Sequence, residues 1–87
     1  MKYQIKFEKQ AEKDFERIEK SPYKNKVLNL LEKISVNPYE PPAERLVGEY
    51  LGLYSLRINQ QHRLVYKVVD DKYIVIVLAM WTHYKNI

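Results

Sequence analysis

The stretch LYSLRINQQHRLVYKVV, residues 53–69, decides the fold of this 87-residue chain. Apolar side chains recur at every second position from Tyr54, and the alternation resumes at Arg63 after a polar stretch at 59–62. A period of two predicts half-buried strands, and a short polar stretch between two such strands predicts a hairpin. In this phase Leu56, Ile58, Leu64 and Tyr66 face the core. Arg57 and Arg63 then share the opposite, exposed face, close enough for both to touch one anion.

A third, longer strand is predicted to follow the hairpin. Asp70-Asp71 makes a turn, and the run from Lys72 to Tyr84 is apolar enough to predict burial on both faces for much of its length. Antiparallel pairing with residues 63–69 would bring His83 back to the level of Asn59. His83 is therefore expected within one or two residues of Arg57.

The N-terminal half predicts a short strand followed by two helices. Residues 2–7 alternate, and the apolar residues of 8–19 and 27–34 recur at helical spacing. Ser21-Pro22 favours the start of the second helix, and Asn37-Pro38 favours its end. Residues 37–50 are predicted to be an irregular connection. The expected order is β-α-α-β-β-β, an α+β domain with an antiparallel-rich sheet packed on two helices.

Composition is typical of a single globular domain, expected to span residues 1–87. Hydrophobic residues make up 46% and charged residues 30%, which excludes an extended disordered chain. The absence of cysteine excludes disulfides and thiolate metal sites and favours a cytoplasmic protein. No apolar run reaches the roughly 18 residues of a spanning helix, so no membrane partner is expected. The formal net charge of +4 favours a polyanionic or acidic partner.

Five polar side chains of the second half have the chemistry to act on a phosphodiester: Glu44, Arg57, Arg63, His83 and Tyr84. A carboxylate, two guanidiniums, an imidazole and a phenol include a base, two phosphate clamps and an acid, the parts needed to cut RNA without a metal. Periodicity does not place Glu44, although the short span to Leu53 allows it to reach the face of the arginines.

At these residues the chain resembles the YoeB/Txe branch of the RelE/ParE toxins. The resemblance is carried by Glu44-Arg45-Leu46, Gly52, Ser55, Arg57-Ile58, the block His62–Tyr66 and the pair His83-Tyr84, over roughly residues 37–84. It implies a RelE-like, microbial-RNase-type fold. It also implies a toxin of a type II toxin-antitoxin system that cleaves messenger RNA in the ribosomal A site and so inhibits translation.

The resemblance implies a role for each candidate residue. Glu44 would be the general base that takes the proton of the 2′-OH, which attacks the adjacent phosphorus and leaves a 2′,3′-cyclic phosphate. Arg57 and Arg63 would stabilise the charge on the nonbridging oxygens. His83 would protonate the leaving 5′-oxygen, and Tyr84 would orient the phosphate or stack on a base. No metal or other cofactor is implied.

The resemblance further implies an acidic cognate antitoxin that is partly disordered until it binds. This partner would wrap the basic surface and cover or displace the tail that carries His83 and Tyr84. Related toxins form homodimers, and contact with operator DNA would occur only through the antitoxin. Two other functions remain open: a noncatalytic ParE-like inhibitor of gyrase, and a basic nucleic-acid-binding module whose arginines hold phosphates. His62 is expected to support the turn between the two hairpin strands.

Overall fold

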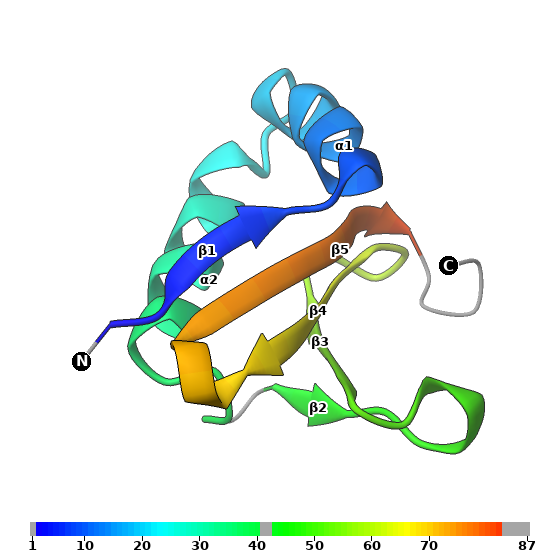
Figure 1. The fold of residues 1–87 in the computed structure, drawn as a ribbon. Helices are drawn as coiled ribbons and strands as arrows, with labels where there is room; N and C mark the ends of the chain where they lie inside the picture. The colour runs from blue at the N-terminus through cyan, green and yellow to red at the C-terminus, as the bar shows by residue number, and fades with distance from the viewer. Residues whose placement is uncertain (1, 41–42, 83–87) are drawn as a thin grey trace.

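The structure, a computed structural model, describes residues 2–40 and 43–82 (Figure 1). The elements follow in the order β1 (Gln4–Phe7), α1 (Lys9–Glu19), α2 (Lys24–Val36), β2 (Glu44–Arg45), β3 (Leu53–Arg57), β4 (Arg63–Val69) and β5 (Ile74–Thr82), with 3-10 turns at Gly48–Tyr50 and Asp70–Lys72. The predicted β-α-α-β-β-β order is confirmed. The segment 37–50, predicted to be irregular, in addition contains the short strand β2.

The sheet has the strand order β1-β5-β4-β3-β2. Strand β1 runs parallel to β5, whereas the other neighbours are antiparallel. In Figure 1 the first strand therefore lies directly beside the last one, with the two helices on one side of the sheet. This is the antiparallel-rich α+β fold that the sequence predicts. None of the helices among the described residues is long and apolar enough to cross a membrane.

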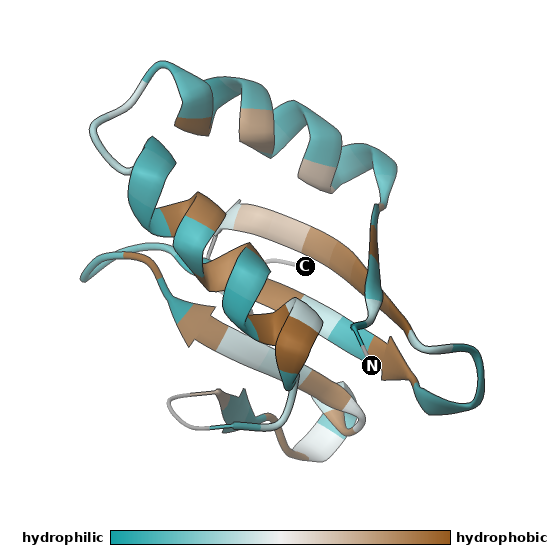
Figure 2. Cartoon of the chain, turned by 90° about the vertical axis from the view of Figure 1, so that its left-hand side faces the viewer, coloured by the Kyte–Doolittle hydropathy of each residue, from teal (hydrophilic) through white to brown (hydrophobic). Residues whose placement is uncertain are grey.

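Each helix turns an apolar stripe toward the sheet. In α1 the stripe holds Ala11 and Ile18, both fully buried. Figure 2 shows hydrophobic bands on the side of the helices that faces the sheet and hydrophilic ones on the outer side. Helix α2 begins at Lys24, three residues after Ser21. The Ser21 hydroxyl accepts the N–H of Tyr23 at 3.1 Å and donates to the carbonyl of Ile18 at 2.8 Å, so this serine joins the two helices.

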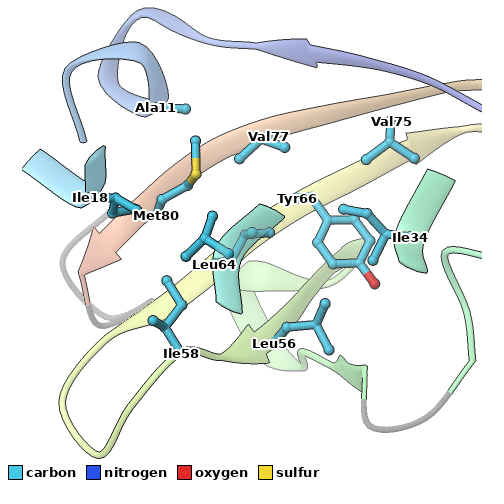
Figure 3. Packing of buried hydrophobic residues seen from close by; sticks show 11 residues of the cluster. Ala11, Ile18, Ile34, Leu56, Ile58, Leu64, Tyr66, Val75, Val77 and Met80 are labelled. Atoms are coloured by element: carbon cyan, nitrogen blue, oxygen red, sulfur yellow. The ribbon is translucent and has the colours of Figure 1, made fainter. Parts of the chain in front are cut away.

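The core lies between the helices and one face of the sheet (Figure 3). The hairpin contributes the four side chains predicted to face the helices, Leu56, Ile58, Leu64 and Tyr66, all of them fully buried. The Tyr66 hydroxyl donates to the carbonyl of Pro38 at 2.5 Å. The largest side chain of the core thus also anchors the chain just after α2.

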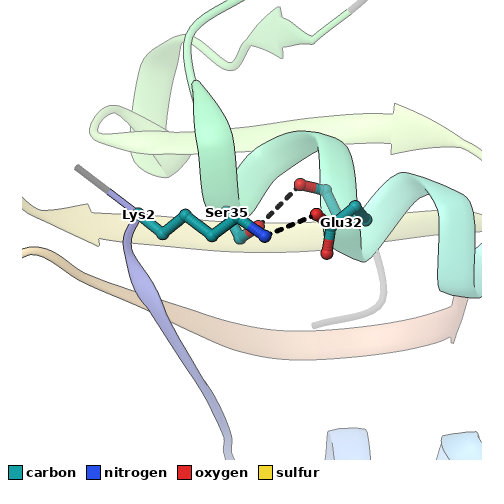
Figure 4. A network of polar contacts seen from close by, with 3 residues as sticks. All are labelled: Lys2, Glu32 and Ser35. Atoms are coloured by element: carbon teal, nitrogen blue, oxygen red, sulfur yellow. Dashed lines mark hydrogen bonds and ion pairs between the residues drawn. The ribbon is translucent and has the colours of Figure 1, made fainter.

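The N-terminal strand is tied to the end of α2. The N–H of Tyr3 donates to the carbonyl of Ser35 at 2.6 Å, and Lys2 forms a 2.7 Å ion pair with Glu32, whose carbonyl accepts the Ser35 hydroxyl (Figure 4). Both ion-pair side chains are largely exposed, so the pair adds little stability. The strand starts at Gln4 rather than at the predicted Lys2.

Strand β5 differs from its prediction in start, register and burial. It starts at Ile74, because the chain turns at Asp70–Lys72 and Tyr73 takes the left-handed conformation with φ of 52°. Register shifts on both sides of Val65 place Thr82 opposite Arg63. The predicted register, with His83 level with Asn59, would instead have placed Ala79 opposite Arg63, three residues before Thr82. Val75 and Val77 on one face of β5 are buried, whereas Ile74, Ile76 and Leu78 on the other face are only half-buried.

Candidate active site

The β3–β4 hairpin places the two arginines directly opposite each other. Arg57 and Arg63 are register partners at the end of the paired segment. The turn that joins them is closed by the side-chain oxygen of Asn59, which accepts the N–H groups of Gln61 and His62 at 2.8 Å each. The carbonyl of His62 accepts the N–H of Ile58 at 2.9 Å. The predicted common face of the arginines is therefore built by a turn with its own hydrogen bonds.

Strand β2 adds a carboxylate to this face. Glu44 pairs with Ser55, and paired residues project to the same side of a sheet. Ser55 lies two residues before Arg57, so it also projects to the side of the arginines. The Glu44 carboxylate lies 3.4 Å from Nη1 of Arg63, which donates to the Ser55 hydroxyl at 3.2 Å. The structure thus brings Glu44, which periodicity left unplaced, into an ion pair with Arg63.

The three residues of this cluster differ in exposure. The Arg63 side chain is 15% exposed and that of Glu44 is 59% exposed, whereas Ser55 is fully buried. The prediction that Arg63 lies on an exposed face is wrong, because its guanidinium packs down onto Ser55. Arg57 is exposed as predicted. One arginine is therefore held by the protein while the other faces solvent.

The segment that leads to Glu44 is fixed by tyrosines. Besides the bond from Tyr66 to Pro38, the Tyr39 hydroxyl donates to the Asp70 carboxylate, which also accepts from Tyr3 at 2.9 Å. The Tyr39 ring packs edge-on against Tyr54 at 5.3 Å. Burial raises the pKa of Tyr66, and burial together with the Asp70 hydrogen bond raises the pKa of Tyr39. These neutral phenols connect residues 38–39 to the sheet shortly before β2.

Sequence reasoning missed Asp14, which positions the end of β5. Its carboxylate is 4% exposed, accepts the backbone N–H of Met80 at 3.0 Å and accepts Nε2 of Gln10 at 3.0 Å. Met80 lies where the β4–β5 register is irregular. The Asp14 carboxylate accepts its N–H there. The signal was present in the sequence, because Asp14 is a charged residue at helical spacing between the buried Ala11 and Ile18. Ser55 was likewise visible on the polar face of β3.

The proposed acid His83 and its neighbour Tyr84 lie outside the described residues. The last described pair of β5 joins Thr82 to Arg63, so the strand returns to the arginine hairpin. Within residues 2–40 and 43–82, no group of three or more His, Cys, Asp or Glu side chains could hold a metal ion. The part of the site that the structure describes therefore consists of Glu44, Ser55, Arg57 and Arg63.

Two helices packed on a five-stranded, antiparallel-rich sheet are the fold of RelE- and YoeB-like toxins. The family described as the YoeB-like toxin of bacterial type II toxin-antitoxin systems matches residues 7–84. The chain belongs to this family and is the toxin component of such a system.

Individual relatives agree with this assignment. An Escherichia coli protein described as a RelE-like toxin is 32% identical over 81 residues, which cover 92% of this chain and 82% of that protein. In the Staphylococcus aureus YoeB-YefM heterotetramer a chain with 31% identity superposes with a TM-score of 0.80 and covers 97% of this chain and 100% of its own. An Agrobacterium tumefaciens YoeB/ParE toxin superposes with a TM-score of 0.85 at 24% identity, covering 93% and 99%, and shows the shared fold.

Proposed function

We propose that this toxin is a ribosome-dependent endoribonuclease that cuts messenger RNA in the ribosomal A site without a metal ion. The observation that supports it most is the cluster in which Glu44 contacts Arg63, Ser55 holds that arginine, and Arg57 lies directly opposite. RelE and YoeB toxins are generally endoribonucleases. A carboxylate beside two guanidiniums provides both the base and the anion clamp of such a reaction.

The free protein holds Glu44 and Arg63 in an ion pair that a phosphate can replace. When the scissile phosphate binds Arg63 and Arg57, it competes with the Glu44 carboxylate for the guanidinium. The carboxylate, already the more exposed partner, becomes available to accept the proton of the 2′-OH. The oxygen of the 2′-OH attacks phosphorus, and the two arginines stabilise the charge on the nonbridging oxygens.

The second half of the reaction uses the tail. We assign protonation of the leaving 5′-oxygen to His83, and orientation of the phosphate or stacking on a base to Tyr84. The products are a 2′,3′-cyclic phosphate on one fragment and a free 5′-hydroxyl on the other. No step requires a metal or another cofactor.

The proposed partners follow from the same function. The toxin acts in the cytoplasm on messenger RNA bound to the ribosome, and an acidic antitoxin inhibits it by wrapping the basic surface, as charge complementarity favours. The Staphylococcus aureus relative is known in a complex with YefM and as a dimer, which supports an antitoxin partner and a homodimer for this chain. Operator DNA would be contacted only through the antitoxin.

The test is cleavage of messenger RNA on purified ribosomes, mapped by primer extension. Glu44→Gln should lower the cleavage rate by about 10² to 10⁴ because the base is lost. Arg63→Lys keeps the charge but loses the guanidinium fork, and should lower the rate by about 10² to 10³. His83→Ala should have an effect of the same order. Arg45→Gln is the matched control, because Arg45 is exposed on the same strand as Glu44 but projects to the other face.

The product and the comparison of variants decide between functions. Fragments ending in a cyclic phosphate are expected, and circular dichroism should show that each variant is folded. Full cleavage activity in both Glu44→Gln and Arg63→Lys would refute the catalytic roles proposed for these residues, whereas no cleavage by the wild type would refute the nuclease assignment. A gyrase inhibitor would leave ribosome-bound messenger RNA uncut and would instead trap or inhibit gyrase on DNA.

A further inference from the structure

A hollow of about 510 Å³ lies at the end of the sheet where the arginine hairpin turns. It is lined by Tyr23 and Lys26 from the start of α2, by the hairpin turn at residues 58–62, and by Trp81 of β5. Figure 1 shows the β3–β4 turn beside the end of β5. None of Glu44, Ser55, Arg57 and Arg63 lines it, so the hollow is separate from the candidate active site.

One wall of the hollow is a fixed stack of rings. The imidazole of His62 lies 3.9 Å from Trp81 with an interplanar angle of 8°, and Tyr23 lies 5.9 Å from Trp81 at 51°. His62 and Trp81 are half-buried, and Nδ1 of His62 is buried with no hydrogen-bond partner among the described residues. Rings already held in place can accept a further flat ring with little loss of conformational entropy.

The rest of the lining is polar and carries no negative charge. Gln60 and Gln61 are exposed on the turn and offer amide donors and acceptors, whereas the Asn59 oxygen is used to close the turn. Lys26 is exposed and supplies one cation. Aromatic rings, amides and a single ammonium together match a nucleotide, whose base stacks, whose edge hydrogen-bonds and whose phosphate is negative.

The hollow lies on the helix side of the hairpin end, and the turn at residues 58–62 connects it with the arginine face. His62 and Arg63 are consecutive, with Cα atoms about 3.8 Å apart, and the same turn leads back to Arg57 on the other strand. An RNA strand whose phosphate lies on the arginines can therefore reach the hollow with a neighbouring nucleotide by rounding this turn.

We infer that this hollow binds one nucleobase of the RNA strand, next to the phosphate that Arg57 and Arg63 hold. The inference rests on the proposed ribonuclease function and adds a second contact to it. His62 and Trp81 provide the stacking wall, Gln60 and Gln61 contact the base edge, and Lys26 contacts a flanking phosphate.

Trp81 makes the inference directly measurable, because it is the only tryptophan in the chain. A short 2′-O-methyl oligoribonucleotide, which cannot be cleaved because its 2′-OH is blocked, is titrated into the protein at low salt. Saturable quenching of the Trp81 emission is expected. His62→Ala should weaken binding of a fluorescein-labelled copy by roughly tenfold, as loss of one stacking contact does. His62→Phe keeps a ring on Trp81 and should retain binding.

A matched pair of lysines tests the phosphate contact. Lys26→Gln should weaken binding a few-fold and reduce the salt dependence, because one phosphate contact is lost. Lys24→Gln removes the same charge from an exposed position two residues earlier that does not line the hollow, and should bind like the wild type. Equal effects of the two substitutions would show a general charge effect and would overturn the site.

The remaining outcomes separate this inference from the proposed function. Glu44→Gln should abolish cleavage but keep the quenching. Binding of the labelled oligonucleotide without any change in Trp81 emission, or no binding at all, would overturn the nucleobase site even if the wild type cuts messenger RNA on ribosomes. Quenching by an acidic antitoxin peptide but not by the oligonucleotide would overturn it too and would make the hollow a protein-binding site. Quenching that persists in a protein that never cuts RNA would refute the ribonuclease function alone.

Discussion

Replacement of Asp14 should destabilise this toxin more than any exposed carboxylate of the same helix. The Asp14 side chain is 4% exposed and its carboxylate accepts the N–H of Met80, a residue that is fully buried. Asp14→Ala removes the acceptor and leaves that N–H without a partner in a region from which water is excluded. The other lost contact, with Gln10, is a hydrogen bond within the helix and contributes little.

The expected magnitude follows from these two contacts. A hydrogen bond to a charged group contributes about 1.5 to 3 kcal/mol, and a buried donor left unpaired costs about 1 to 3 kcal/mol. Removing a buried carboxylate also removes the cost of its desolvation, so we expect Asp14→Ala to lower the free energy of unfolding by about 3 kcal/mol in total. For a domain of this size that lowers Tm by roughly 12 to 24 °C. Asp14→Asn keeps an acceptor oxygen and should lose about 1 kcal/mol.

Urea unfolding followed by circular dichroism measures these free energies, and amide hydrogen exchange reports on Met80 itself. Glu16→Ala is the control, because Glu16 is exposed on the same helix and its loss should change stability by less than about 0.5 kcal/mol. The Met80 amide should exchange much faster in Asp14→Ala than in the wild type. A stability of Asp14→Ala within about 0.5 kcal/mol of the wild type, with Met80 still protected, would refute the reasoning.

Two further predictions concern the buried tyrosines. Tyr66→Phe should lower the free energy of unfolding by about 1 to 2 kcal/mol, because the carbonyl of Pro38 loses its donor. Urea unfolding measures this loss. Tyr73→Phe is the control, because the Tyr73 side chain is exposed and its substitution should leave the free energy of unfolding unchanged. Burial raises the pKa of Tyr66 in the folded state, so the unfolded chain loses this proton first as the pH rises. This group should leave the free energy of unfolding unchanged below about pH 10 and lower it above that pH by about 1.4 kcal/mol per pH unit. Urea titrations at several pH values would measure this slope, which Tyr66→Phe should reduce.

The hairpin and both helices could be predicted from sequence because their signals are local. Alternation across 53–69 sets which side chains face the helices, and that phase alone places Arg57 with Arg63. The short strand β2 could not be predicted, since two residues, Glu44 and Arg45, carry no period. Its pairing partner is Ser55, and only that pairing brings the carboxylate to Arg63.

The register of β5 could not be read from the sequence for a different reason. Pattern alone assumes a regular ladder, whereas the real strand carries extra residues between Val77 and Thr82. Such irregularity leaves backbone groups out of the ladder, and it is tolerated here because Asp14 supplies an acceptor to Met80. The information therefore lies in a contact between a helix and a strand, not in the strand itself.

The candidate site is assembled on the hairpin by two buried polar contacts that join distant parts of the chain. Tyr66 fixes Pro38 from 28 residues away, shortly before Glu44, and Asp14 fixes Met80 from 66 residues away, shortly before the tail. Apolar packing alone leaves side chains free to shift, whereas a hydrogen bond also sets direction. Substitutions at Tyr66 or Asp14 can therefore displace the proposed catalytic groups while every charged residue on the arginine face is still present. In such variants the rate of cleavage should fall even under conditions in which the protein remains folded.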